Sequence, residues 1–349
     1  MNKLPVLPTD FDAAFIEAAM NAPPGTLARF SFDPVGTGQV CDSYRFTCQW
    51  TQAGPPSSFI AKCPSADEAS RAAAALFHLY STEVGWYSDI AAHTQVRRPM
   101  AYQANIAADG SAFVLMLEDM APAIQGDQLA GATVQQVRAA LSEAAALHAW
   151  RPPAGDFTQF SWLNHGGSNR EVLLNALPAI YPQFRERFAD LLSTDILDLG
   201  HELIVRLERY FDHEQAEICL QHSDLRIDNI LYDQGTDRAV VVDWQTLAIG
   251  TSAGDVAYLL GTSFADGQER RDCELPLLDE YLDRRAQIGQ APDRTAFMND
   301  IRRFAFAGFI MAIIASNQVV QTERGDRMFA AMAARPAQMA IDWDSLASI

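Results

Sequence analysis

The spacing of the hydrophobic positions changes near residue 118 and divides the chain into two parts. Before that point, short runs of aromatic and β-branched residues alternate with turns rich in glycine and proline, a pattern typical of β-strands. We expect strands at residues 28–34, 40–50, 57–63, 97–105 and 111–120. Between the third and the fourth, residues 66–90 carry leucine and tyrosine at helical spacing. This part is therefore predicted to be a small antiparallel sheet with one major inserted helix.

Helical periodicity dominates the rest of the chain. The clearest amphipathic pattern is TVQQVRAALSEAAALHAW at residues 133–150, which ends shortly before two consecutive prolines. Short strand-like runs interrupt the helices only around residues 218–244, where a β-hairpin is expected. We therefore predict an α+β, bilobal chain, with residues 1–118 as a sheet-rich N-lobe and residues 119–349 as a larger helical C-lobe that contains the hairpin.

Composition and charge narrow the class of protein. The chain has 349 residues, of which 49% are hydrophobic, as expected for a folded globular protein with two lobes. Its formal net charge of −18 argues against a nucleic-acid partner and against binding to anionic membranes. The five cysteines are scattered without CxxC spacing, and the chain begins without the apolar stretch of a signal peptide. We therefore expect a cytoplasmic protein.

The hairpin region, QHSDLRIDNILYDQGTDRAVVVDWQ at residues 221–245, carries the strongest candidate chemistry. Asp224 and Asn229 precede the first strand, Asp243 follows the second, and the turn should bring Asp243 near Asn229. Oxygen ligands of this kind hold Mg²⁺ together with ATP phosphates, and a separate carboxylate can orient an acceptor hydroxyl. Taken alone, the segment before the hairpin or the segment after it could equally well be an ordinary turn that uses Asp or Asn. Chance is a much poorer explanation for both segments together at hairpin spacing. A carboxylate after four apolar residues also needs a compensating partner.

A phosphoryl-transfer site also needs a lysine on a strand and a glutamate on the helix that follows. Lys62 ends the apolar strand FIAK, and Glu83 lies 21 residues later in the predicted helix. Together they would hold the α- and β-phosphates of ATP. Taken singly, each is more simply a surface charge, and Glu68 is a rival partner that is less well placed. Gly36 and Gly38 would let a loop approach the phosphates, although a two-glycine hairpin turn is commoner.

With these motifs, the chain resembles the aminoglycoside phosphotransferase and choline kinase superfamily, which has the protein-kinase-like fold. The resemblance extends over nearly the whole length, from the strand before Lys62 to the helices after Asp255. The most similar branch is the ecdysteroid-kinase-like, or CHK kinase-like, branch. Three features of this chain favour that branch: Glu83 followed by two aromatic residues, the hinge-like LEDM at residues 117–120, and VVDWQ at residues 241–245.

The resemblance implies a role for each candidate residue. Asp224 would be the catalytic base or would orient the acceptor hydroxyl, Asn229 and Asp243 would bind Mg²⁺, and Lys62 with Glu83 would anchor the phosphates. The adenine would lie against the hinge, and a structural aspartate would brace the catalytic loop, residues 222–229. The residues concerned are Glu118 and Met120 for the adenine and Asp255 for the brace.

Two positions of the catalytic loop depart from the family pattern. The usual His-Gly-Asp reads His-Ser-Asp here, and Ser223 is strained if its position requires a positive φ. Asp228 adds a carboxylate before Asn229, which either faces solvent or tunes the metal site. Neither change removes a chemical group that the reaction needs, so the site is expected to be competent.

We expect an ATP-dependent small-molecule kinase that transfers the γ-phosphoryl group to a hydroxyl of an alcohol, an aminoalcohol or an aminoglycoside-like acceptor. Aromatic and methionine residues in the helical lobe suggest an apolar alcohol if they line the acceptor site, but they could equally be core. They are Phe157, Phe160, Phe264, Phe309 and Met311. The acidic surface suggests an amine instead. The alternative is a nucleotide-binding pseudokinase with a regulatory role. A protein kinase is disfavoured because the interval between Asp243 and Asp255 is too short for a long activation loop.

Overall fold

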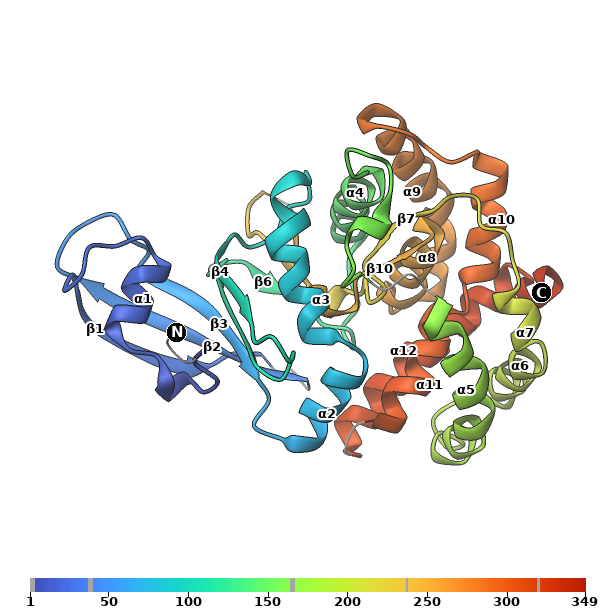
Figure 1. Cartoon of the computed structure of the whole chain (residues 1–349). Coiled ribbons are helices and arrows are strands. Elements are labelled where there is room, and N and C mark those ends of the chain that lie inside the picture. Colours follow the sequence, from blue (N-terminus) through green and yellow to red (C-terminus); the bar gives the residue numbers. More distant parts are fainter. Residues whose placement is uncertain (1–3, 37–39, 164–166, 237, 319–320) are drawn as a thin grey trace. The chain divides into compact units, whose positions relative to one another are not determined.

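The computed structural model describes residues 4–36, 40–163, 167–236, 238–318 and 321–349 (Figure 1). The chain divides into two compact units. We call the first the sheet unit; it comprises Met1–His93, Arg98–Ala121 and Asp243–Thr246. We call the second the helical unit; it comprises Thr94–Arg97, Pro122–Val242 and Leu247–Ile349. The backbone passes from the helical unit to the sheet unit at the Val242–Asp243 peptide, directly before one of the candidate residues.

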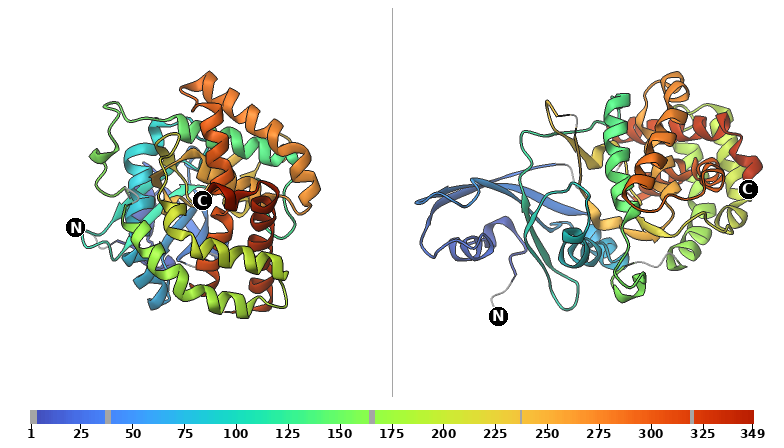
Figure 2. Two further views of the ribbon diagram at one scale, coloured as in Figure 1. Left: turned by 90° about the vertical axis from the view of Figure 1, so that its right-hand side faces the viewer. Right: turned by 90° about the horizontal axis from the view of Figure 1, so that it is seen from above.

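The sheet unit is built on a five-stranded antiparallel sheet in the order β1-β2-β3-β5-β4. Its strands are β1 (Leu27–Pro34), β2 (Cys41–Trp50), β3 (Ser58–Pro64), β4 (Ala101–Ile106) and β5 (Phe113–Glu118). All five predicted strands are present, although β4 begins later than expected because Pro99 has no backbone N–H to donate to a neighbouring strand. Helix α1 (Ala13–Ala19) covers one face of the sheet (Figure 2). Phe46 and Phe59 stack beneath it, with ring centroids 4.8 Å apart.

The helical segment between β3 and β4 is broken rather than continuous. It comprises α2 (Glu68–Leu76), α3 (Leu79–Gly85), a π-helical turn η2 (Trp86–Ile90) and a 3-10 turn η3 (Ala91–His93). His78 separates α2 from α3 because its φ of 56° lies in the left-handed region, where a right-handed helix cannot continue. The sheet unit also contains the 3-10 turns η1 (Pro8–Asp10) and η6 (Trp244–Thr246).

The helical unit is organised around helix α8 (Ser252–Ser263), which is buried along its whole length. Four helices of the described chain pack against it (Figure 1): α4 (Val134–Ala149), α10 (Arg294–Phe304), α11 (Ala307–Gln318) and α12 (Glu323–Asp342). The unit also contains the helices α5 (Gly167–Arg187), α6 (Thr194–Val205), α7 (Leu207–Phe211) and α9 (Gly267–Ile288), and the 3-10 turns η4 (Phe157–Gln159), η5 (Ile227–Asn229) and η7 (Ser345–Ser348). A helix buried on all sides can hold its polar groups in fixed positions, and α8 carries two that matter below.

The predicted hairpin is confirmed. Strand β8 (Ile230–Tyr232) pairs antiparallel with β9 (Ala239–Val241), so that Ile230 lies opposite Val241. A short strand β6 (Ile124–Gln125) extends this sheet. Strand β7 (Cys219–Gln221) also forms, and it pairs with β10 (Ala248–Gly250), a strand of three residues too short to leave a pattern in the sequence. The catalytic loop therefore lies between β7 and β8.

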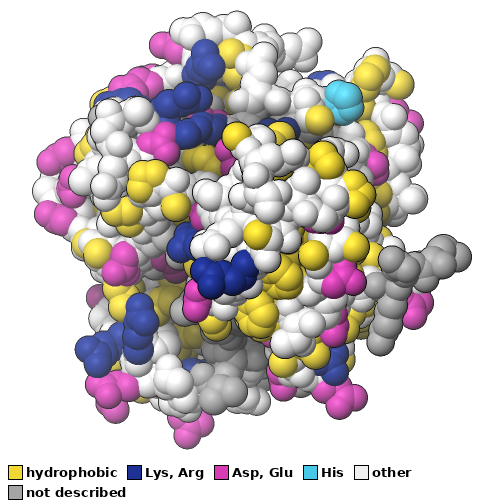
Figure 3. Space-filling model, turned by 90° about the vertical axis from the view of Figure 1, so that its left-hand side faces the viewer, with side chains coloured by type: hydrophobic (Ala, Val, Ile, Leu, Met, Phe, Trp, Pro, Cys, Tyr) yellow, Lys and Arg dark blue, Asp and Glu magenta, His cyan; other side chains and the backbone are white. Residues whose placement is uncertain are grey.

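One face of the molecule is mixed in charge despite the acidic composition. Acidic and basic side chains are interspersed on the face shown in Figure 3 instead of forming one acidic patch. Throughout the described part of the chain, every helix is too short or too polar to cross a membrane.

Candidate active site

The sheet unit brings Lys62 and Glu83 together. Lys62 lies on β3 and is 8% exposed, while Glu83 lies on α3 and is 2% exposed. The Lys62 Nζ donates to both carboxylate oxygens of Glu83, at 2.6 and 2.7 Å. Glu68, the rival partner, is exposed at the beginning of α2. The break at His78 gives α3 its own start, separate from α2, and α3 is the helix that carries Glu83 to Lys62.

Asp243 binds the same ammonium group. Its Oδ1 lies 3.0 Å from Lys62 Nζ, so one cation is shared by two carboxylates, and we call these three residues the Lys62 cluster. Burial alone would lower the pKa of Lys62, but Asp243, Cys41 and Glu83 together raise this pKa well above its usual range. Lys62 therefore keeps its proton and its charge in this cluster.

The backbone around Asp243 is held in an uncommon conformation. Its φ is 66°, in the left-handed region. The next residue, Trp244, donates its backbone N–H to Glu83 Oε1 at 3.4 Å. Its indole stacks on Trp86, which lies in the π-helical turn, with centroids 4.0 Å apart and an interplanar angle of 18°. Aromatic stacking and a backbone hydrogen bond thus fix the residue after Asp243, and this compensates for the unfavourable φ.

The remaining candidates of the sheet unit lie at its loops. Gly36 has a φ of +77°, which suits glycine, and a Cβ there would meet nothing within 4 Å. Gly38 lies outside the described residues. Glu118 ends β5, and its backbone N–H donates to the Met100 carbonyl at 2.8 Å. Met120 follows two residues later and is half-buried.

The helical unit brings Asp224 and Asn229 together. The Asn229 Nδ2 donates to Asp224 Oδ2 at 2.8 Å and to the Asp224 carbonyl at 2.9 Å. Both partners are acceptors, so the amide nitrogen must face Asp224 and the amide oxygen must face away. Within the described part of the chain, nothing donates to this oxygen, and a hard oxygen left over beside a carboxylate fits a magnesium ligand.

Asp255 holds the catalytic loop through its backbone. It is fully buried in the first turn of α8 and accepts from the backbone N–H groups of His222 at 2.6 Å and Ser223 at 2.9 Å. Ser223 has a φ of 67°, so the serine occupies the left-handed conformation that glycine adopts without strain. The contacts agree with the bracing role that the family resemblance implies for Asp255.

A hydrogen-bonded chain behind Asp255 includes His148, Tyr281 and Arg285. The His148 Nε2 lies 3.1 Å from Asp255 Oδ2, and its Nδ1 lies 2.8 Å from the Tyr281 hydroxyl. The Arg285 guanidinium can only donate, and it donates to the Tyr281 oxygen at 2.9 Å. Because a carboxylate only accepts, the imidazole donates from Nε2 to Asp255. His148 is a structural residue.

Two residues near Asp224 were not expected from the sequence. Tyr258 donates its hydroxyl to Asp224 Oδ1 at 2.9 Å, and the Arg226 Nε lies 3.3 Å from the same oxygen. Burial lowers the pKa of Arg226, but Asp224, Tyr258 and Asp228 more than reverse this and raise it. The sequence did contain a signal for Tyr258, because it follows Asp255 by three residues and so lies on the same face of α8.

The structure shows which groups Asp228 contacts. Asp228 forms an ion pair with Arg226, and its Oδ1 accepts the Gln128 backbone N–H at 2.8 Å. Its own carbonyl accepts from the Gln125 side chain at 2.6 Å. Asp228 thus ties the catalytic loop to the segment that follows β6.

The aromatic residues suggested for the acceptor site belong largely to the core. Phe157, Phe264 and Phe309 are all buried, and Phe309 packs edge-to-face on Phe184 with centroids 5.9 Å apart. The apolar-alcohol interpretation therefore loses its main support.

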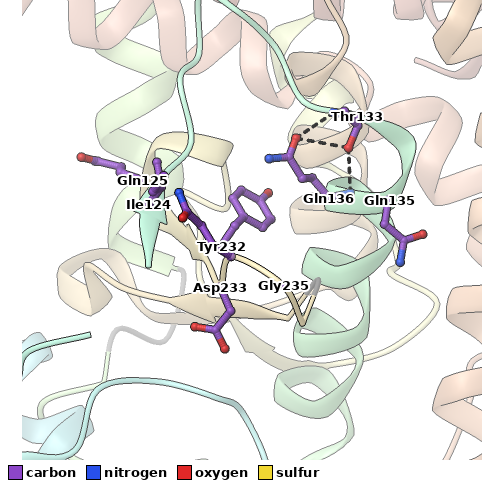
Figure 4. A pocket seen from close by; sticks show the side chains of 9 residues that line it. Ile124, Gln125, Thr133, Gln135, Gln136, Tyr232, Asp233 and Gly235 are labelled. Carbon is purple, nitrogen blue, oxygen red and sulfur yellow. Dashed lines mark hydrogen bonds between the residues drawn. The ribbon is translucent and has the colours of Figure 1, made fainter. Parts of the chain in front are cut away.

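The helical unit also has a hollow of about 280 Å³ near the hairpin turn (Figure 4). It lies between β6, the beginning of α4 and residues 232–235, and four of its nine lining residues are glutamines. Its lining carboxylate, Asp233, is paired with Arg97 at 2.6 Å. Across the described residues, His, Cys, Asp and Glu do not form a group of three or more that could hold a metal ion.

Comparison with known proteins agrees with the fold. The model of the phosphotransferase enzyme family matches residues 43–297. Among curated proteins, no match was found. A putative aminoglycoside phosphotransferase from Ralstonia eutropha is 15% identical, with a TM-score of 0.55 over 97% of this chain and 98% of its own.

Two further solved structures are similar at comparable levels. An amicoumacin kinase in complex with AMP-PNP, Ca²⁺ and Ami is 14% identical, with a TM-score of 0.52 over 95% of both chains. An ethanolamine kinase from Plasmodium vivax is 12% identical, with a TM-score of 0.53 over 88% of this chain and 82% of its own. At these identities, the likeness establishes the protein-kinase-like fold predicted from the sequence.

Proposed function

This chain belongs to the phosphotransferase enzyme family, and we propose that it is an ATP-dependent small-molecule kinase acting on a hydroxyl acceptor. The observation that carries this proposal is the Lys62 cluster, in which one buried ammonium is shared by Glu83 and Asp243. A buried charge is costly to desolvate and is retained where it is paired or where a ligand uses it. Within the family, we place the chain nearest the CHK kinase-like branch.

Residues 1–118 supply the nucleotide-binding groups in this proposal. Lys62, held by Glu83, binds the α- and β-phosphates, and the loop of Gly36 and Gly38 approaches them through its backbone. The LEDM segment, with Glu118 and Met120, contacts the adenine. AMP-PNP in the amicoumacin kinase structure supports an adenine nucleotide.

Residues 119–349 supply the catalytic loop. Asn229, through its outward amide oxygen, and Asp243 are the proposed magnesium ligands. Bound Mg²⁺ would supply neutralisation of the charge on the phosphates. The residues themselves provide one oxygen each, and this agrees with an ion that takes most of its ligands from nucleotide phosphates and water.

Asp224 positions the acceptor. It accepts a hydrogen bond from the acceptor hydroxyl, whose oxygen attacks the γ-phosphorus while the bond to the bridging oxygen of ADP breaks. The hydroxyl proton passes to the Asp224 carboxylate as the new O–P bond forms. The protein's contribution is mostly orientation and charge stabilisation, since this reaction needs little covalent help.

We propose an amine-bearing alcohol as the acceptor, in the range from aminoalcohols to aminoglycosides. The acidic composition favours a cationic substrate, and the burial of the phenylalanines removes the argument for an apolar one. The ethanolamine and amicoumacin kinases are similar in fold, which supports testing acceptors of both sizes.

The test begins with thermal unfolding in the presence of ATP, with and without Mg²⁺. A ligand at about 100 times its dissociation constant stabilises the folded protein by about 2.7 kcal/mol, a shift that is easily read. An acceptor screen follows, in which ADP release is measured with ethanolamine, choline, gentamicin and streptomycin. A Mg²⁺-dependent shift with ADP release supports the proposal. A shift without release from any acceptor supports the pseudokinase alternative, which the strained Ser223 favours, and the absence of a shift contradicts both.

A further inference from the structure

The two oxygens of Asp224 have different surroundings. Oδ1 accepts from the Tyr258 hydroxyl at 2.9 Å and lies 3.3 Å from Arg226 Nε. Oδ2 accepts from Asn229 Nδ2 at 2.8 Å. An ionised carboxylate has about four lone-pair positions, two on each oxygen. Among the described residues, Tyr258 thus occupies one position of Oδ1 and Asn229 one position of Oδ2, and the Arg226 charge lies beside Oδ1.

Tyr258 is rigidly placed for this contact. It lies on the buried helix α8, is 2% exposed, and follows Asp255 by one turn. One helix therefore fixes the catalytic loop twice, at its backbone through Asp255 and at the side chain of Asp224 through Tyr258. Burial and the nearby Asp224 raise the pKa of Tyr258 well above its usual range, so the hydroxyl keeps its proton and remains a donor.

We propose that Tyr258 is a positioning residue for phosphoryl transfer, which turns Asp224 so that Oδ2 is the oxygen that receives the acceptor hydroxyl. The inference rests on the proposed function. The terminal torsion of an aspartate is broad and roughly two-fold, so a carboxylate without this donor can present either oxygen to the acceptor. Fixing Oδ1 removes that freedom before the substrate binds, and orientation of this kind contributes to rate rather than to nucleotide binding.

The competing explanation is that Tyr258 is a core residue whose hydroxyl takes the nearest acceptor. The variant Tyr258→Phe separates the two, because it removes one hydroxyl and leaves the ring. The matched control is Tyr181→Phe, which removes a buried hydroxyl that donates to the Leu197 carbonyl in the same unit. A purely structural role predicts equal effects of the two variants on stability and on activity.

The measurements are kcat and KM with the best acceptor of the screen, and the ratio of acceptor phosphorylation to ATP hydrolysis by water. This ratio is independent of the fraction of folded enzyme. For Tyr258→Phe we expect kcat to fall by about ten- to a hundredfold, with KM for ATP unchanged and the ratio shifted towards hydrolysis. Tyr181→Phe should change neither kcat nor the ratio.

A double-mutant cycle with Asp224→Asn adds an independent reading. If Tyr258 acts through Asp224, Tyr258→Phe should have almost no further effect on kcat in the Asp224→Asn background. Additive effects would overturn the proposal, as would a wild-type ratio in Tyr258→Phe. If Tyr258→Phe does not fold, Arg226→Gln, which removes the other group beside Oδ1, must lower kcat and shift the ratio in the same way.

The failure of this inference can be told apart from failure of the proposed function. A wild-type protein that binds MgATP and phosphorylates an acceptor, while Tyr258→Phe behaves like Tyr181→Phe, overturns the role of Tyr258 alone. A wild-type protein that releases no ADP with any acceptor or with water overturns the kinase function, and the positioning role falls with it.

Discussion

The Lys62 cluster and the catalytic loop both consist of charged groups, but they are held in different ways. In the cluster, Glu83 and Asp243 each bind Lys62 directly. In the loop, Asp255 holds the backbone through two N–H groups, and the side chain of Asp224 is bound from outside. Directly paired charges can be redistributed when a charged ligand arrives, whereas a backbone brace keeps its geometry throughout. The cluster is thus suited to bind phosphates and the loop to orient a reacting group.

The largest expected effect comes from removing the group that the loop orients. Asp224→Ala should lower kcat by about a thousandfold, within the range for loss of a positioned acid–base group. ATP binding should be unchanged because the phosphate anchor lies in the Lys62 cluster. Steady-state kinetics and the ATP thermal titration measure the two quantities. The control is Asp233→Ala, a carboxylate on the same hairpin that pairs with Arg97, and it should keep nearly full activity. A fall in ATP affinity equal to the fall in kcat would contradict the proposal that the Lys62 cluster binds ATP while the catalytic loop orients the acceptor.

Removing the brace tests the other side of the comparison. Asp255→Ala leaves two buried backbone N–H groups and His148 without their acceptor, so we expect the free energy of unfolding to fall by about 3–5 kcal/mol. Chemical denaturation measures the loss. Glu323→Ala is the control, because this carboxylate pairs with Arg327 at an exposed position and should matter little. Equal stability of the two variants would show that Asp255 does not brace the loop.

The Lys62 cluster should respond differently to the loss of one member. Lys62→Met leaves Glu83 buried without its cation, and we expect a loss of about 3 kcal/mol in stability. ATP affinity should also fall by tenfold or more. The double variant Lys62→Met/Glu83→Gln should recover part of the stability, since no unpaired charge remains at Glu83, but none of the ATP affinity. Recovery of both would mean that the cluster is only structural. Wild-type behaviour of Lys62→Met would mean that Lys62 contributes neither to stability nor to ATP binding.

The sequence predicted the fold and the residues of both regions, because each leaves a local signal. Lys62 ends an apolar strand, and Asn229 and Asp243 flank a hairpin. What the sequence could not predict was how these groups are held. The break at His78 depends on one residue with a positive φ, and a histidine in the sequence does not predict that conformation. Strand β10 is too short to have a period.

The contacts of the catalytic loop were hidden for a different reason. Tyr258 binds a carboxylate that precedes it by 34 residues, and such a contact exists only after α8 has packed. The sequence left open whether Asp228 faces solvent or tunes the metal site, because its partners, Arg226 and Gln128, are brought to it by the same packing. Residue type and spacing identify reacting groups, whereas their supports depend on tertiary structure.

The smallest expected effect concerns the strained position of the loop. The φ of 67° at Ser223 lies in the left-handed region and costs conformational energy, and Ser223→Gly should relieve that strain. Glycine also gains freedom in the unfolded chain, which offsets part of the gain, so we expect a net stabilisation of about 0.5 kcal/mol. Asp255 already fixes the loop, so kcat should not change. Thermal unfolding and steady-state kinetics measure the two, with Ser193→Gly, at the N-cap of α6, as a control that should destabilise slightly. A large rise in kcat in Ser223→Gly would mean that the serine displaces Asp224 in spite of the brace, and that the wild-type loop is impaired as a pseudokinase would be.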